Sequence, residues 1–275
     1  MQRNVFFISD GTGITAESFG QSLLTQFDDL TYKPMTLPYV NDRVKAAEAL
    51  AYIQSVMAED GNTTLPILFM TVVNDDVRTV LNQCHAYTVD LCATFMPGLE
   101  KEIGQHALNK MGRKRANCSS ESYHRRIEAV QFALDNDDGA GTRHYNKADI
   151  ILLGASRSGK TPTCIYLGLQ FGIFAANYPI TEEDLEVGND LPKSLLPYRS
   201  KLFGMTIDAN RLADIRQERK PDSRYASVRQ CYHEIRCIER IYQQESIGYI
   251  NTSNYSVEEI ATRIMAQTHL ERRLK

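Results

Sequence analysis

Residues 154–161 read Gly-Ala-Ser-Arg-Ser-Gly-Lys-Thr and match the phosphate-loop pattern G-x-x-x-x-G-K-[ST] at every fixed position. The glycines of such a loop let the backbone wrap a phosphate group, so that successive N–H groups point inward. The lysine adds a positive charge, and the threonine hydroxyl is a ligand for Mg²⁺. The segment therefore predicts a site that binds phosphate through the loop, with Thr161 at the metal. Its residues are Gly154, Ala155, Ser156, Arg157, Ser158, Gly159, Lys160 and Thr161.

Phosphoryl transfer also requires a group that orients or deprotonates the nucleophile and positive charge near the developing anion. Asp208 follows an apolar run, where it could bind Mg²⁺ through water or accept a proton. The alternative is that Asp208 only caps the helix that starts near Asn210. Arg157, inside the loop, could contact a phosphate oxygen. We expect Lys160, Asp208 and Arg157 to be the catalytic residues.

Four other patterns have two readings each. Arg216 and Arg219, near the end of a helix, fit either a mobile lid or a solvated helix face. The turn Ser9–Gly13 fits either a second anion-binding turn or an ordinary strand-to-helix turn. Asp137-Asp138-Gly139 could be a metal or base site, but an acidic turn is favoured. His124 could be catalytic, but a structural role is favoured.

The elements around the loop fit a phosphate site, because an apolar strand precedes it and a helix follows it. The rest of the chain alternates between strand and helix patterns in the same way, which is typical of a parallel α/β sheet. Predicted strands cover residues 5–9, 65–73, 149–153, 174–179, 201–208 and 248–252. Predicted helices cover residues 16–27, 44–57, 75–85, 127–134, 163–170, 210–219 and 228–244, with a last helix capped by Ser256 and a helix-compatible polar stretch at 100–126.

The segment 135–147 is rich in Asn, Asp and Gly and is the predicted domain junction. We therefore expect an N-terminal α/β domain at residues 1–145 and a P-loop kinase-like domain with a parallel sheet at residues 146–275.

Composition indicates an ordinary globular protein, since 43% of the 275 residues are hydrophobic and 24% are charged. The net charge of −3 provides no general attraction to nucleic acid or membrane. The six cysteines form no C-x-x-C pair, which predicts scattered reduced thiols. The chain starts without a signal-peptide pattern and has no run of eighteen apolar residues. These features predict a cytoplasmic protein.

Several motifs together resemble the bacterial and plastid regulatory proteins of phosphoenolpyruvate-forming dikinases. The motifs span essentially the whole chain, at residues 5–17, 123–129, 137–139, 154–162, 203–208 and 254–261. Because Gly159 precedes Lys160, the loop resembles the loop of those family members that act on phosphoenolpyruvate synthase.

This resemblance implies a bifunctional enzyme. It would use ADP to phosphorylate a threonine of phosphoenolpyruvate synthase, which inactivates the synthase. It would remove that phosphate with inorganic phosphate as acceptor, forming pyrophosphate. The expected ligands are ADP, inorganic phosphate and Mg²⁺, and a homodimer remains open. Two alternatives stay open. One is an ATP-dependent small-molecule kinase, which the strand–helix layout of the second half supports, and the other is a nucleotide-sensing binding protein without catalysis.

Overall fold

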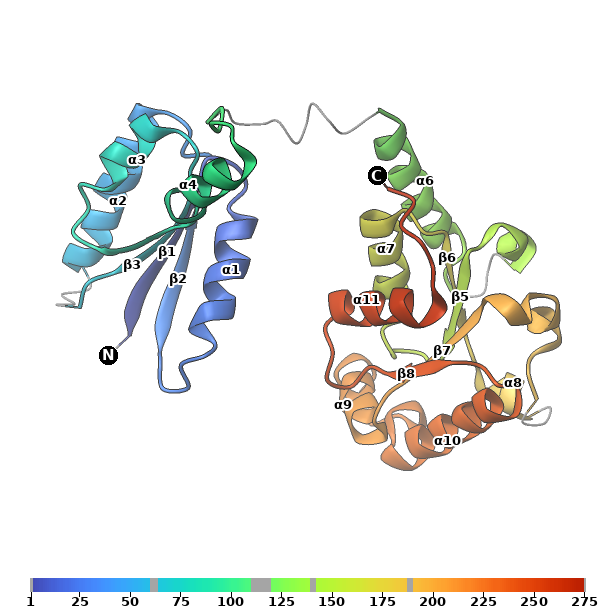
Figure 1. The fold of residues 1–275 in the computed structure, drawn as a ribbon. Coiled ribbons are helices and arrows are strands. Elements are labelled where there is room, and N and C mark those ends of the chain that lie inside the picture. Colours follow the sequence, from blue (N-terminus) through green and yellow to red (C-terminus); the bar gives the residue numbers. More distant parts are fainter. Residues whose placement is uncertain (1, 60–63, 110–119, 139–141, 187–189, 275) are drawn as a thin grey trace. The chain divides into compact units, whose positions relative to one another are not determined.

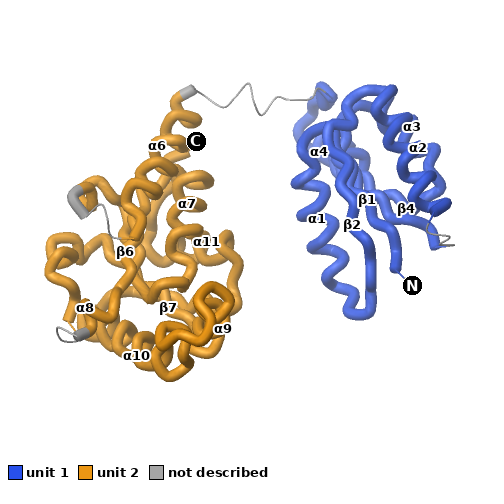
Figure 2. The backbone as a smooth tube through the Cα atoms, turned by 180° about the vertical axis from the view of Figure 1, so that it is seen from behind, with its two compact units in different colours: residues 1–117 blue, residues 118–275 orange. Residues whose placement is uncertain are grey.

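The computed structural model describes residues 2–59, 64–109, 120–138, 142–186 and 190–274. The chain forms two compact units, residues 1–117 and residues 118–275, which are coloured separately in Figure 2. Each unit contains a parallel sheet of four strands with helices packed against it. The predicted α/β fold with two domains is thereby confirmed.

Unit 1 is organised around the apolar strand β1 (Arg3–Ser9), which lies inside a sheet of order β2-β1-β3-β4. Successive side chains of a strand point to opposite faces of the sheet. Val5 and Phe7 accordingly pack with α1, whereas Phe6 and Ile8 pack with α2 and α3. Helices therefore cover both faces of this sheet (Figure 1). The other elements are α1 (Ile14–Leu24), β2 (Tyr32–Leu37), α2 (Arg43–Glu59), β3 (Ile67–Thr71), α3 (Asp75–Leu81), β4 (Tyr87–Asp90) and α4 (Leu91–Ile103).

Unit 2 repeats this plan around β5 (Ile150–Gly154), in a sheet of order β6-β5-β7-β8. Ile151 and Leu153 pack toward α9 and α10, and Ile150 and Leu152 pack toward α7 and α11. The helices are α6 (Ser120–Asp135), α7 (Lys160–Phe171), α8 (Glu182–Glu186), α9 (Ala209–Arg219), α10 (Val228–Gln244) and α11 (Val257–Thr268). The strands are β6 (Ala175–Pro179), β7 (Leu202–Thr206) and β8 (Tyr249–Asn251), and 3₁₀ helices occur at η1 (Thr142–Lys147), η2 (Lys193–Lys201) and η3 (Arg224–Ala226).

Helix α6 belongs to unit 2, so the division between the units falls before it. Ala129, Phe132 and Ala133 of α6 are buried within unit 2. Gly168 of α7 allows a close approach, because a Cβ atom there would lie 3.0 Å from the Ala129 carbonyl oxygen. The compact units thus divide at residues 117 and 118 and not at the predicted junction 135–147, of which residues 139–141 lie outside the described ranges. The polar composition of that junction reflects a connection inside unit 2.

The edge strands β2 and β4 have no counterpart among the strands predicted from the sequence. Strand β2 is only partly buried and contains Pro34, and β4 has four residues. Edge strands of this kind lack the continuous apolar run of a buried strand. The helix-compatible stretch at 100–126 is also interrupted, because α4 ends at Ile103 with Gly104 in the left-handed conformation and α6 begins at Ser120. Residues 110–119 of that stretch lie outside the described ranges.

Two sequence predictions concern the chain as a whole. Among the described residues, no helix combines the length and the apolar character needed to cross a membrane. The five cysteines within the described ranges are free thiols, and Cys118 lies outside these ranges.

Candidate functional site

The glycine loop, defined here as residues 154–161, connects the carboxyl end of β5 to the start of α7, as predicted. Gly154 has a φ of 154°, and a Cβ atom there would lie 2.3 Å from the Met205 carbonyl oxygen of the neighbouring strand. Gly159 precedes α7 with a φ of 92°, a conformation that side chains disfavour. Both glycines are therefore required by the path of the loop. The N-terminus of α7 has no side-chain cap, so its backbone N–H groups are available to an anion.

Lys160 is buried at the first position of α7, with 4% of its surface exposed. Its Nζ donates a hydrogen bond to the Ala155 carbonyl oxygen at 2.8 Å, across the loop. Burial lowers the pKa of Lys160 to about 8, an effect that the acidic neighbours Asp137 and Asp138 partly oppose. An ammonium group in such a position is poorly solvated, so a bound anion would stabilise its charge.

Binding of an anion to the loop is expected to weaken above about pH 8. An anion favours protonated Lys160, and the Lys160 pKa of about 8 means that protonated Lys160 becomes scarce above this pH. The dissociation constant for ADP should be nearly constant from about pH 6.5 to 7.5 and then rise up to about tenfold per pH unit. Calorimetric titration across this range measures it. In a Lys160→Arg protein the cation stays charged, so a bend that persists near pH 8 in that protein would contradict the assignment to Lys160.

Thr161 lies in a small polar cluster with Asp137 and Asn177. The Thr161 hydroxyl donates to Asp137 Oδ1 at 2.8 Å, and the Asn177 side-chain amide donates to the same oxygen. Asn177 lies on β6 with 1% of its surface exposed, and its own Oδ1 has no hydrogen-bond partner among the described residues. Asp137 follows the end of α6, so the packing of α6 on α7 brings this carboxylate to the loop.

These groups surround a cavity of about 500 Å³. It is polar, and its lining includes two aspartates, one lysine and two arginines. Its lining residues are Asp137, Asp138, Ser156, Arg157, Gly159, Lys160, Thr161, Pro162, Asn177 and Arg219. A phosphate group in this cavity would meet the loop, Lys160 and two exposed arginines together.

Of the three residues predicted to be catalytic, Lys160 and Arg157 line this cavity and Asp208 does not line it. Arg157 is exposed and has a φ of 78°. Asp208 is exposed just before α9, where its Oδ1 accepts hydrogen bonds from the backbone N–H groups of Asn210 at 2.9 Å and Arg211 at 3.1 Å. This geometry is the capping role that the sequence left as the alternative. A part for Asp208 in proton transfer stays a prediction.

The Asp208→Ala protein should be less stable but close to normal in phosphoryl transfer. Loss of a helix N-cap of this kind lowers the free energy of unfolding by about 1 kcal/mol. Ser256→Ala is a matched control, because Ser256 caps α11 in the same way, within a capping box. Denaturant unfolding and initial rates should change alike in the two proteins. A loss of rate of about a hundredfold in Asp208→Ala alone would restore Asp208 as the base.

The remaining candidates differ in where the structure places them. Arg219 lines the cavity, but Arg216 is neither in an exposed lid nor on a solvated face, since it is 1% exposed and paired with Glu234. The turn Ser9–Gly13 lies in unit 1, where Asp10 accepts a hydrogen bond from the Val73 N–H at 2.9 Å. His124 is an exposed residue of α6.

The interpretation of Asp137-Asp138-Gly139 as an acidic turn gives Asp137 too little weight. Gly139 lies outside the described ranges, but Asp137 lies at the loop and bonds to Thr161. The signal that could have found it was the presence of this segment among the motifs that resemble the dikinase regulators.

Comparisons with known proteins identify the family of the chain. A family model described as kinase/pyrophosphorylase matches residues 5–265. A relative from Hahella chejuensis, provisionally named phosphoenolpyruvate synthase regulatory protein, is 51% identical over 275 residues, which is all of both chains. A relative from Marinobacter nauticus with the same provisional name is 52% identical over 272 residues, or 99% of each chain. The chain belongs to the kinase/pyrophosphorylase family.

Proposed function

We propose that this chain is a bifunctional regulator of phosphoenolpyruvate synthase. In one direction it transfers the β-phosphoryl group of ADP to a threonine of the synthase, which inactivates the synthase and leaves AMP. In the other it transfers the phosphoryl group from that phosphothreonine to inorganic phosphate, which restores the threonine and forms pyrophosphate. The provisional names of the relatives support the target, and the family description supports a kinase and a pyrophosphorylase.

The observation that carries the proposal is the cavity at the glycine loop, which is lined by the buried Lys160 and by the hydrogen-bonded pair Asp137 and Thr161. Phosphoryl transfer depends mainly on positioning and on neutralising charge on the transferring group. The N-terminus of α7, Lys160, Arg157 and Arg219 provide positive charge on the phosphate side. The same cradle would hold the β-phosphate of ADP in one direction and inorganic phosphate in the other.

Asp137 is the carboxylate best placed for proton transfer or metal binding. In the kinase direction the threonine hydroxyl must lose a proton as its oxygen attacks phosphorus. Asp137 lines the cavity and could accept this proton directly or through water. In the reverse direction the same carboxyl group would return a proton to the departing threonine oxygen.

The residues present also fit Mg²⁺. Thr161 offers a hydroxyl, Asp137 a carboxylate and Asn177 an amide oxygen that is buried without a hydrogen-bond partner in the described chain. Mg²⁺ is commonly held by one or two protein oxygens together with substrate phosphates and water. When bound, the ion would neutralise charge on the phosphoryl oxygens.

The test is incubation of the full chain with phosphoenolpyruvate synthase and ADP labelled at the β-phosphate. Label should move to a synthase threonine with release of AMP, and added inorganic phosphate should then move it into pyrophosphate. Transfer only from the γ-position of ATP, to a small molecule, would instead establish an ATP-dependent small-molecule kinase. Binding of ADP without phosphothreonine or pyrophosphate would establish a nucleotide-sensing binding protein and refute the proposal.

A further inference from the structure

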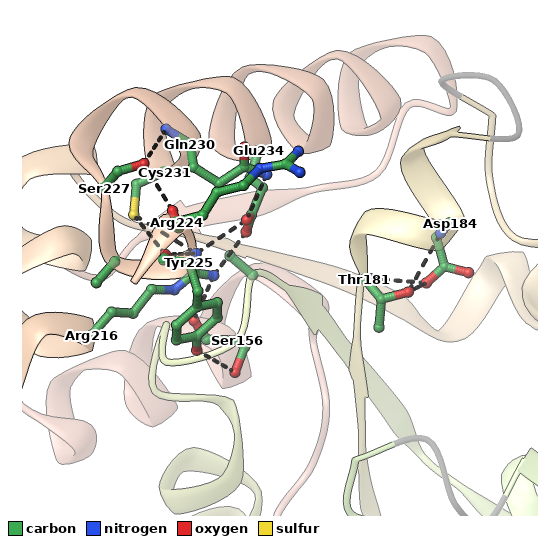
Figure 3. Close-up of polar contacts among 12 residues, drawn as sticks. Ser156, Thr181, Asp184, Arg216, Arg224, Tyr225, Ser227, Gln230, Cys231 and Glu234 are labelled. Carbon is green, nitrogen blue, oxygen red and sulfur yellow. Dashed lines mark hydrogen bonds and ion pairs between the residues drawn. The ribbon is translucent and has the colours of Figure 1, made fainter. Parts of the chain in front are cut away.

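Arg216 is the largest fully buried side chain in the described part of the protein. It extends from α9, and its guanidinium forms a two-pronged pair with Glu234 of α10 at 3.1 and 2.8 Å (Figure 3). The ring of Tyr225 lies against the guanidinium, with the carbon of the group 4.0 Å from the ring centre. The Arg216 guanidinium thus contacts the Glu234 carboxylate on one side and the face of the Tyr225 ring on another.

The same guanidinium contacts the glycine loop. Arg216 Nη2 donates a hydrogen bond to the Ser156 carbonyl oxygen at 3.2 Å, and the Tyr225 hydroxyl donates to Ser156 Oγ at 3.1 Å. Arg216 Nη1 also donates to the Tyr225 carbonyl oxygen at 3.1 Å. The carbonyl oxygen and the hydroxyl of Ser156, a residue that lines the cavity, are therefore held by residues outside the loop (Figure 3).

Stability alone does not account for a buried arginine at this place. Burying an ion pair removes both charges from water, and apolar residues of similar volume are often as good or better for stability. Arg216 Nε adds to this cost, because it is buried and has no hydrogen-bond partner among the described residues. A feature that costs stability and contacts a phosphate-binding loop indicates a role in the site.

We infer that Arg216 and Tyr225 are positioning residues that hold Ser156 in place. The loop then presents N–H groups to a bound phosphate, and the Ser156 carbonyl oxygen does not point at the phosphate. A carbonyl oxygen turned into the cavity would repel an anion, whereas here it accepts a hydrogen bond from a cation. Neither residue lines the cavity, so both act through Ser156. This inference rests on the proposed phosphate-binding function of the loop.

A role limited to packing would change the unfolding temperature. A role in positioning the loop would change anion binding in a protein that unfolds at the normal temperature.

The decisive variant replaces the ion pair by apolar residues, Arg216→Met together with Glu234→Leu. We expect this protein to unfold at the same temperature as the original chain or higher. Its dissociation constants for ADP and for inorganic phosphate should rise about tenfold or more, because a misplaced loop loses several amide contacts at once. The control, Arg199→Gln with Glu245→Gln, removes an ion pair of 2.7 Å between η2 and the end of α10 and should change neither constant.

A folded apolar-pair protein with normal dissociation constants for ADP and for inorganic phosphate would overturn the inference. If that protein does not fold, Tyr225→Phe decides, because it keeps the ring against Arg216 and removes only the hydroxyl that bonds Ser156. We expect a rise of about threefold in the two constants for Tyr225→Phe, and unchanged constants would overturn the inference as well. Absence of phosphothreonine with the original chain would instead refute the proposed function. The two failures are distinguishable, because the binding measurements do not depend on phosphoryl transfer.

Discussion

Replacement of Lys160 by alanine should lower the rate of both proposed directions by about a thousandfold or more. Lys160 is the buried cation of the cavity, and in either direction the phosphate held by the loop would lose its partner. The chain itself should remain folded. Burial already disfavours the Lys160 charge, as its lowered pKa shows, so removal of the ammonium group relieves a cost.

The measurement is transfer of label from ADP to the synthase, with the unfolding temperature recorded in parallel. Lys193→Ala is a suitable control, because Lys193 is an exposed lysine of η2 in the same unit. Near-normal phosphorylation by folded Lys160→Ala protein would show that the glycine loop is not the site of transfer.

The Asp137→Asn protein should lose about a hundredfold or more in both directions. Asp137 Oδ1 accepts hydrogen bonds from the Thr161 hydroxyl and the Asn177 amide, and asparagine keeps the size of the side chain while removing its charge. Asp135→Asn is the matched control, since Asp135 is an exposed residue at the end of α6, two residues before Asp137, and accepts a hydrogen bond from Gln131.

Two further readouts separate the roles open to Asp137. If the carboxylate binds Mg²⁺, the asparagine protein should require more Mg²⁺ for half-maximal rate. If it accepts the proton, the dependence of the rate on pH should change while the Mg²⁺ requirement stays the same. An Asp137→Asn protein with normal rates would exclude both roles and return attention to Asp208.

The elements that carry the glycine loop were predictable because their signals are local. Residues 150–153 form one apolar run, and the glycines mark the turn before α7, so strand, loop and helix appear where the sequence places them. The capping box at Ser256 and Glu259 is likewise contained in four residues and is present in the structure. Local patterns of this kind require no knowledge of the rest of the fold.

The partners of the loop were not predictable in the same way, because they depend on packing between distant segments. The sequence of α9 predicts a lid or a solvated face for Arg216, because its partner Glu234 lies on another helix and nothing within α9 indicates this pairing. Asp137 reaches Thr161 through the packing of α6 on α7, where Gly168 allows a close approach. No pattern within a single element contains either contact.

The close packing of α6 on α7 also determines how the chain could be divided. A fragment that started at residue 146 would contain the whole glycine loop but would lack Asp137 and all of α6. Ala129, Phe132 and Ala133 would be missing from the core of unit 2, so the apolar surface that they cover would be open to water and to association with other molecules. A fragment that keeps the whole site therefore has to begin near residue 118, well before the glycine loop.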